Sequence, residues 1–256
     1  MCTVSVVPKD DGFRLVCNRD EVVSRSVALP PQRRDLGSTS AVFPIDPDGG
    51  GTWIGVNSDG LVMVILNRSA AQHARPARPD LRSRGVIIPA LLRHGSVSAA
   101  VRAAGELEPT EFAPFQLVAI QGRAVSVVTW DGTLEATENL VMTAPRLFTS
   151  SSFGDTPVEP PRRQLFAASV INAPDSWLEG QWRFHRHRWQ DRPEVSVRMQ
   201  RPDARTVSRS TIDVTAASAR IDYEPLFAQE AEIAPTQRQI LDLRTGERPA
   251  GIDKIG

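Results

Sequence analysis

The second residue of the chain has the chemistry of a nucleophile. If the initiator methionine is removed, Cys2 becomes the first residue and carries both a thiol and a free α-amine. A terminal amine can take the thiol proton directly or through one water molecule. The pKa of an α-amine is roughly 7.7–8.0 and that of a free thiol is roughly 8.5, so both groups exchange protons near neutral pH. These properties predict attack on an acyl carbon; the alternative is an ordinary second residue.

Cys2 is expected at the open end of a β-hairpin. Residues 3–7 and 13–17 form short segments rich in β-branched and apolar residues, and Pro, Asp and Gly between them at 8–12 are typical of a turn. A turn centred on the middle of 8–12 would place Cys2 opposite about Asn18. The hairpin therefore brings the thiol to the end of the second strand.

Two charged residues follow that second strand. Arg19 would favour the thiolate of Cys2, because a nearby guanidinium lowers the pKa of a cysteine. Asp20 would hold or orient the α-amine. The alternative is that residues 18–21, Asn-Arg-Asp-Glu, form a solvated strand end.

Other patterns in the chain suggest binding more than catalysis. The arginines of residues 69–84 form either a rim that captures an anionic ligand or a solvated loop. Residues 182–189 combine rings and cations, so this segment could stack on nucleobases, ligate haem iron through His185 or His187, or lie on the surface with its tryptophans packed inward. The glycines of 49–51 lack the following Lys-Ser/Thr of a phosphate-binding loop.

Composition limits the class of protein. The 256 residues include 30 basic and 30 acidic side chains, so no overall charge attracts nucleic acid or a membrane surface. The longest apolar stretch, 61–66, is too short to cross a bilayer, and no signal peptide is recognised at the start. Two cysteines outside a CxxC pair suit a reducing compartment. We expect a cytoplasmic protein that binds a small molecule, with no nucleic acid and no membrane insertion.

Repeated hairpins organise the chain. Strand pairs are predicted at 52–56 with 61–66, at 115–120 with 124–130, and at 194–201 with 205–214, with a last strand at 219–223. The few helices are predicted at 83–93, 96–104, 162–170 and near 237–243. Strands that form antiparallel sheets with helices kept outside them make an α+β layered fold.

Several motifs resemble those of the NRDE family, the transport and Golgi organisation proteins. The opening Met-Cys-Thr is followed by Asn-Arg-Asp-Glu at 18–21, by Gly-Thr-Trp-Ile-Gly-Val-Asn at 51–57 and by Leu-Asn-Arg at 66–68. The resemblance resumes at 83–85, at 149–151 and at 196–208, and it covers about residues 1–223. It implies a fold related to N-terminal nucleophile hydrolases, a four-layer αββα sandwich. It also implies a single domain over 1–224 and an accessory tail over 225–256.

The resemblance also assigns roles to residues. The segment around Asn57 and Gly60 is similar to one in the choloylglycine and penicillin V acylases, in which the asparagine that ends the next strand donates its amide to the oxyanion. Asn67 holds that place here, although on its own it could simply cap the strand. The predicted catalytic set is therefore Cys2, Arg19, Asp20 and Asn67. The predicted ligand-binding residues are Asn18, Trp53, Asn57, Arg68, Arg84 and Ser151.

Two functions remain open at this stage. The first is an N-terminal cysteine amidohydrolase that cleaves a small amide or a thioester, with no cofactor. The alternative is a non-catalytic protein that binds haem, or an acyl-CoA or lipid, on the same scaffold. The sequence differs from the acylases at two points: Arg19 and Asp20 are adjacent rather than separated, and Ala144 stands where a second amide donor is expected.

Overall fold

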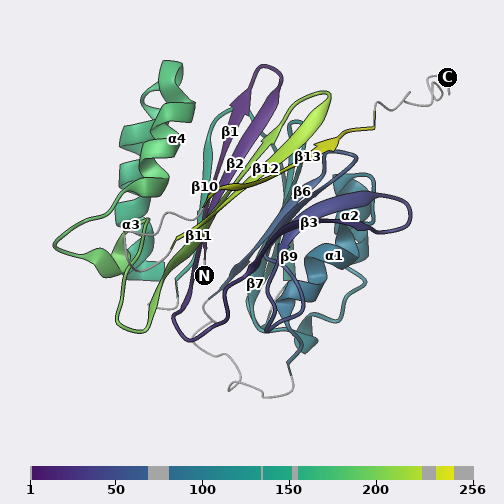
Figure 1. Cartoon of the computed structure of the whole chain (residues 1–256), viewed down its shortest axis with the longest axis horizontal. Helices are drawn as coiled ribbons and strands as arrows, with labels where there is room; N and C mark the ends of the chain where they lie inside the picture. Colours follow the sequence, from purple (N-terminus) through teal and green to yellow (C-terminus); the bar gives the residue numbers. More distant parts are fainter. Residues whose placement is uncertain (1, 69–80, 134, 152–154, 227–234, 245–256) are drawn as a thin grey trace.

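Two antiparallel sheets face each other at the centre of the molecule, and helices cover their outer faces (Figure 1). This architecture is seen in a computed structural model that describes residues 2–68, 81–133, 135–151, 155–226 and 235–244. The layers run helix, sheet, sheet, helix, so the predicted αββα sandwich is confirmed.

The first sheet carries the N-terminus. Its strands lie in the order β10 (Arg146–Thr149), β1 (Cys2–Lys9), β2 (Gly12–Val22), β11 (Ala204–Val214), β12 (Ser218–Pro225) and β13 (Gln237–Asp242). β1 and β2 form the predicted hairpin, and β1 is also hydrogen-bonded to β10 on its other side. The first residue of β1 therefore lies between two neighbouring strands.

The second sheet is a meander, in which consecutive strands are neighbours. Its strands are β3 (Leu29–Asp35), β4 (Ser40–Ile45), β5 (Ile54–Asn57), β6 (Val62–Asn67), β7 (Phe115–Gln121), β8 (Ala124–Trp130) and β9 (Glu135–Val141). Its central strands have hydrophobic residues on both faces, because one face packs on the first sheet and the other packs on helices.

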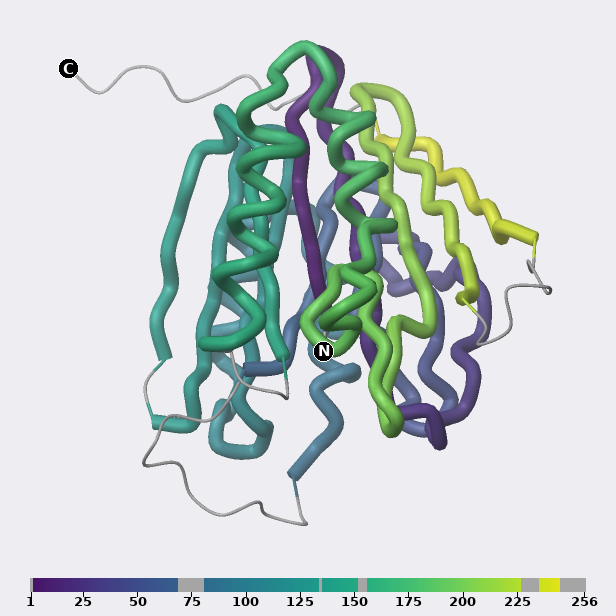
Figure 2. Tube along the Cα trace, turned by 90° about the vertical axis from the view of Figure 1, so that its left-hand side faces the viewer, coloured from purple at the N-terminus to yellow at the C-terminus, as the bar shows by residue number. Residues whose placement is uncertain are grey.

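Helices α1 (Ile87–Leu91) and α2 (Val97–Ala104) cover the second sheet, whereas α3 (Asp155–Phe166) and α4 (Trp177–Arg186) cover the first (Figure 2). Shorter helical turns are Arg84–Val86, Pro109–Glu111, Pro174–Ser176 and Pro193–Val195, and a π-helical turn spans Ala167–Ile171. Ser96 caps α2 by accepting a hydrogen bond from the Ala99 amide, as its position before an apolar helical run predicts.

Strand alternation gives β1 and β2 two different faces. Val4 and Leu15 point into the apolar core between the sheets, while Ser5 and Asn18 point toward α4, where they contact His185. A residue of the N-terminal hairpin therefore belongs either to the inter-sheet space or to a buried polar layer under the helices.

Several predicted elements are wrong in detail. The helix expected near 237–243 is instead the strand β13, because the edge of β12 offers hydrogen-bond partners that pair Tyr223 with Gln237. Residues 194–201 are not a strand; Arg198 and Gln200 instead donate their amides to the preceding loop. The helix expected from residue 162 begins at Asp155 and runs through Pro160 and Pro161.

The expected helix over 83–93 is divided. Ser83 caps the turn Arg84–Val86 as predicted, and α1 follows as a separate short helix. Pro89 is accommodated in the first turn of α1, where a backbone amide has no helical partner. Within the described part of the chain, no helix is long and apolar enough to cross a membrane.

Candidate active site

Cys2 is fixed by main-chain bonds at the start of β1. Its carbonyl oxygen accepts a hydrogen bond from the Ser150 amide at 3.0 Å, and its own N–H donates to Ser150 Oγ at 3.3 Å. Its residue opposite on β2 is Arg19, not Asn18 as the hairpin pattern predicted. Removal of Met1 would turn this N–H into an α-amine that already has a hydroxyl group beside it.

The register difference of one residue changes which side chains accompany Cys2. In an antiparallel pair, opposite residues point to the same face. Arg19 and Cys17 therefore share the face of Cys2, and Asp20 points to the other one. The predicted register, with Cys2 opposite Asn18, would instead have put Asp20 on the face of the thiol.

A second thiol supports the thiolate form of Cys2. Cys2 and Cys17 are both free and both buried, with exposures of 3% and 0%. A hydrogen bond with Cys17 lowers the pKa of the Cys2 thiol, although burial opposes it and Arg19 assists. Burial raises the pKa of Cys17 well above the ordinary value, so Cys17 stays protonated and can donate.

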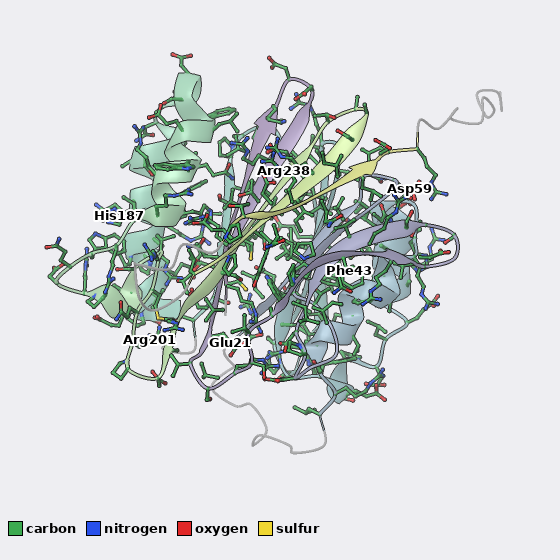
Figure 3. The ribbon with its side chains drawn as sticks, in the orientation of Figure 1. Glu21, Phe43, Asp59, His187, Arg201 and Arg238 are labelled. Carbon is green, nitrogen blue, oxygen red and sulfur yellow. The ribbon has the colours of Figure 1, made fainter. Side chains whose placement is uncertain are left out.

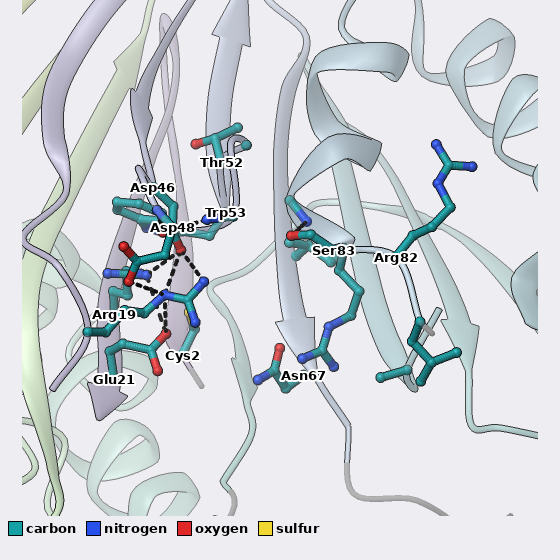
Figure 4. A pocket seen from close by; sticks show the side chains of 18 residues that line it. Cys2, Arg19, Glu21, Asp46, Asp48, Thr52, Trp53, Asn67, Arg82 and Ser83 are labelled. Atoms are coloured by element: carbon teal, nitrogen blue, oxygen red, sulfur yellow. Dashed lines mark hydrogen bonds and ion pairs between the residues drawn. The ribbon is translucent and has the colours of Figure 1, made fainter. Parts of the chain in front are cut away.

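A cavity of about 510 Å³ opens beside Cys2 between the two sheets. Figure 4 shows Asn67, at the end of β6, across this cavity from Cys2 and Arg19. Asn67 has no side-chain hydrogen bond to the described residues, so its amide is available to a ligand. The lining also includes Glu21, Arg25, Asp46, Asp48, Trp53, Arg82, Ser83 and Arg84.

Arg19 is held in place by a carboxylate and a ring. Its Nη2 lies 2.8 Å from Asp46 Oδ2, and its guanidinium carbon lies 4.4 Å from the centre of the Trp53 ring. Asp46 also binds Arg25 at 2.9 Å. Because Asp46 neutralises part of the positive charge of Arg19, this side chain mainly forms a rigid part of the cavity lining beside the thiol.

A tight loop presents Asp46. Its Oδ1 accepts hydrogen bonds from the amides of Asp48 and Gly49, which close the turn after β4. At Gly51 a Cβ atom would overlap the backbone of Gly85, so only glycine allows this approach. The glycine run therefore shapes the cavity wall.

The predicted arginine rim is present in part. Arg84 lines the cavity and donates to the Pro114 carbonyl at 2.7 Å, and burial lowers the pKa of its guanidinium. Arg82 also lines the cavity and pairs with Glu111 at 2.6 Å. The other arginines of this prediction, at 75 and 78, lie outside the described residues.

Asp20 lies in the buried layer under the helices. Its carboxylate accepts a hydrogen bond from Thr206 Oγ1 at 2.6 Å and lies 3.8 Å from Arg162. Burial raises the pKa of Asp20 despite these two partners. It is not among the described residues that line the cavity, and its role toward the amine remains a prediction.

Four predicted ligand-binding residues are not among the described residues that line this cavity. Asn18 donates to the carbonyls of His185 and Val197, and Asn57 donates to those of Leu92 and His94. Both asparagines are fully buried and join elements of the fold.

The other two lie close by. Ser151 accepts a hydrogen bond from Arg201 at 3.0 Å. Arg68 follows Asn67 and lines a neighbouring cavity. Of the six predicted ligand-binding residues, the first cavity thus contains Trp53 and Arg84.

The basic aromatic segment lies on the other side of the first sheet. His185 is buried between Ser5 Oγ, at 2.7 Å, and Asn18 Oδ1, and burial lowers its pKa well below the ordinary value. Figure 3 places His187 on the helical side of that sheet, away from Glu21 in the cavity. Trp182 is 54% exposed, so the expected inward packing is wrong for this ring. In the described residues, no group of three or more His, Cys, Asp or Glu could hold a metal ion.

Sequence reasoning overlooked Cys17 and Asp46. Cys17 could have been found from the hairpin, because the correct register places it on the face of Cys2. Asp46 contacts Arg19 across 27 positions of sequence and from the other sheet, and local pattern carries no signal for such a pair. Ser150, directly after β10, belongs to the segment 149–151 of the family resemblance, but its contact with the main chain of Cys2 is long-range and carries no local signal.

Comparisons with known proteins agree with this arrangement. The model of the family described as Transport and Golgi organisation 2 (TANGO2) matches residues 1–160. No curated protein gives a significant match to the sequence.

Solved structures of amide hydrolases share the fold. Penicillin V acylase from Agrobacterium tumefaciens has a TM-score of 0.57 at 13% identity, over 96% of this chain and 87% of that one. The N-acylethanolamine-hydrolyzing acid amidase ortholog of Caenorhabditis elegans has a TM-score of 0.51 at 12% identity, over 82% of this chain and 92% of that one. The C2A mutant of conjugated bile acid hydrolase from Clostridium perfringens has a TM-score of 0.51 at 12% identity, over 94% and 92%. The fold is that of the N-terminal nucleophile hydrolases.

Proposed function

Because the chain belongs to the Transport and Golgi organisation 2 family and has the scaffold of an N-terminal nucleophile hydrolase, we propose that it hydrolyses a small amide or thioester with Cys2 as nucleophile. The observation that carries this proposal is the meeting of Cys2 and Asn67, from different sheets, at one cavity. The fold neighbours are named as a penicillin V acylase and an N-acylethanolamine-hydrolyzing acid amidase, and their likeness supports the scaffold rather than the reaction.

In this proposal the reaction follows from the groups beside Cys2. The α-amine formed by loss of Met1 takes the thiol proton, and the sulfur adds to the acyl carbon. The Asn67 amide hydrogen-bonds the resulting oxyanion. The protonated amine then gives its proton to the leaving nitrogen or sulfur, which departs as the C–N or C–S bond breaks. Water adds to the Cys2 thioester and releases the acid, and the thiol recovers a proton.

Two neighbours prepare Cys2 for this role. Ser150 Oγ lies at the nitrogen that would become the amine, and it can orient the lone pair toward the thiol. Cys17 donates to the thiolate, which keeps more of Cys2 in its reactive form. The two free thiols also suit the cytoplasmic location that we propose.

The first test measures the N-terminus and then the thiol. Intact mass should show loss of Met1, and iodoacetamide should alkylate Cys2 before Cys17, because burial keeps the Cys17 thiol protonated. A panel of p-nitroanilides and thioesters should then be cleaved by the wild type and not by Cys2→Ala. Hydrolysis that survives Cys2→Ala, or a retained Met1 in an active protein, would refute the proposed mechanism.

The same cavity could instead hold a ligand without turnover. The pairing of Glu21 favours this second candidate, because the carboxylate that β2 presents on the face of Cys2 is already engaged by Arg19 at 3.3 Å and Arg25 at 3.8 Å. Haem would not use His185, which both Ser5 and Asn18 already engage. A Soret band that changes with Cys2→Ala, without hydrolysis of any substrate, would favour this candidate.

A further inference from the structure

A second cavity shares Asn67 with the first. It has a volume of about 280 Å³ and is enclosed by β10, by β6 to β9, and by α3. Asn67 contributes to both cavities, and Ser150, which binds the main chain of Cys2, lines the second one. A substrate bound at Cys2 and Asn67 can therefore extend in two directions.

An arginine without a carboxylate partner points into this second space. Arg146 is opposite Val6 on β1, so its side chain is directed between the sheets, on the same face as Cys2. Its Nε is buried, and it has no hydrogen-bond partner and no ion pair within the described part of the chain.

The arginines of the described chain that are buried as whole residues are paired. Arg19 binds Asp46, Arg162 lies beside Asp20, and Arg209 binds Glu224. Arg146 is half-buried, and its Nε is a buried donor without a hydrogen bond to the described residues. Burying an N–H group without an acceptor costs free energy, and an anion bound beside Arg146 would supply one.

The charged residues of the described chain that line the second cavity are mostly basic. Arg68 and Arg163 accompany Arg146, and Glu138 and Glu159 are the acidic members, which gives this described lining a net charge of one positive. Glu159 is engaged by Arg163 one helical turn away. The lining is therefore complementary to one negative charge.

We propose that the second cavity binds an anionic end group, a carboxylate or a phosphate, on one arm of the substrate. This inference rests on the proposed function, because it assumes that the scissile bond lies at Cys2 and Asn67 and that the other arm of the substrate occupies the first cavity. The substrate class is then an amide or thioester of an acidic small molecule. Arg146 is the residue that selects it, through charge-assisted hydrogen bonds to the anion.

The test measures anion binding apart from turnover. Glutarate and inorganic phosphate, the two probes, are titrated by calorimetry into the wild type, Cys2→Ala, Arg146→Met and Arg146→Lys. We expect saturable binding of at least one probe to the wild type and to Cys2→Ala. Arg146→Met should weaken this binding roughly ten- to hundred-fold, the effect of losing a hydrogen bond to a charged group, and Arg146→Lys should weaken it less.

Two further variants distinguish a loss of anion binding from a loss of folding. Arg163→Met removes an exposed cation from the cavity wall and should weaken binding several-fold with unchanged melting temperature. Arg183→Met removes an exposed arginine that pairs with a glutamate at the same helical spacing but lies outside the cavity, so it should leave binding unchanged.

The outcomes separate this inference from the proposed function. Binding lost in Arg146→Met but kept in Cys2→Ala supports the anion site even if no substrate is hydrolysed. Binding of neither probe to the wild type, or equal binding by a folded Arg146→Met and the wild type, overturns it. In an active protein, glutaryl p-nitroanilide should be preferred over its methyl ester, and only Arg146→Met, not Arg183→Met, should abolish that preference.

Discussion

Replacing Arg162 by methionine should destabilise the protein more than any surface change. The guanidinium is completely buried and donates to the Val195 and Ser196 carbonyls, at 3.0 and 2.6 Å. It also donates to the hydroxyls of Thr3 and Thr149, at 2.7 and 3.1 Å. These contacts join α3 to β1, which carries Cys2, to β10 and to the segment at Val195 and Ser196.

The cost follows from what remains after the substitution. Methionine fills part of the space but leaves those oxygens without the Arg162 donor, and it removes the cation that lies 3.8 Å from the Asp20 carboxylate. Breaking a buried ion pair by removing one partner costs about 3–5 kcal/mol. Since single domains have about 5–15 kcal/mol of stability, Arg162→Met should lose a large part of it.

Urea unfolding followed by circular dichroism measures this loss. Arg163→Met is the matched control, because its exposed pair with Glu159 should contribute only about 0–1 kcal/mol. Adding Asp20→Asn to Arg162→Met removes the uncompensated charge and should recover part of the loss. If Arg162→Met cost less than about 1 kcal/mol, or if Asp20→Asn gave no recovery, the buried network would not be the stabilising unit described above.

Three other outcomes follow from the structure. The free energy of unfolding should fall as the pH drops below 6.5, by up to about 1.4 kcal/mol per pH unit, because burial depresses the pKa of His185 and only the unfolded chain takes up its proton. Urea titrations at two pH values test this, and His185→Asn should reduce the dependence of stability on pH. Gly180→Ala should cost about 1–3 kcal/mol, since a Cβ there overlaps the Ser169 carbonyl, whereas Gly105→Ala, in ordinary contact, should leave the melting temperature nearly unchanged. If the protein hydrolyses amides, Asn67→Ala should lower kcat by roughly 10²–10³ while the rate of Cys2 alkylation stays the same; an unchanged kcat would remove Asn67 from the mechanism.

The hairpins could be predicted from the sequence, but the register of the first one was predicted wrongly by one residue. Turn residues and alternating apolar segments indicated β1 with β2 and β5 with β6, since both signals are local. The same signals leave a register uncertain by one residue, and here that residue decides whether Arg19 or Asp20 faces the cavity. The local fold was therefore accessible while the composition of the site was not.

The contacts that assemble the site are far apart in the chain. Ser150 reaches Cys2 over 148 positions, and His185 reaches Ser5 over 180. Neither pair leaves a periodic pattern, so a single sequence gives no reason to associate them. Arg19 and Asn67, which the family resemblance selected, do line one cavity, because such a resemblance carries this long-range information.

The two halves of the candidate site belong to different sheets, and this division has an evolutionary consequence. Cys2 moves with the first sheet and Asn67 with the second, so the gap between them is set by the thickness of the side-chain layer that separates the sheets, about 10 Å in such packings. A descendant that enlarges one side chain in that layer must shrink a facing one to keep the gap. Substitutions among the outer helices face no such requirement. Substitutions should therefore accumulate faster in the outer helices than between the sheets. Between the sheets they should occur in compensating pairs, so covariation between residues on facing strands would reflect the spacing of the site.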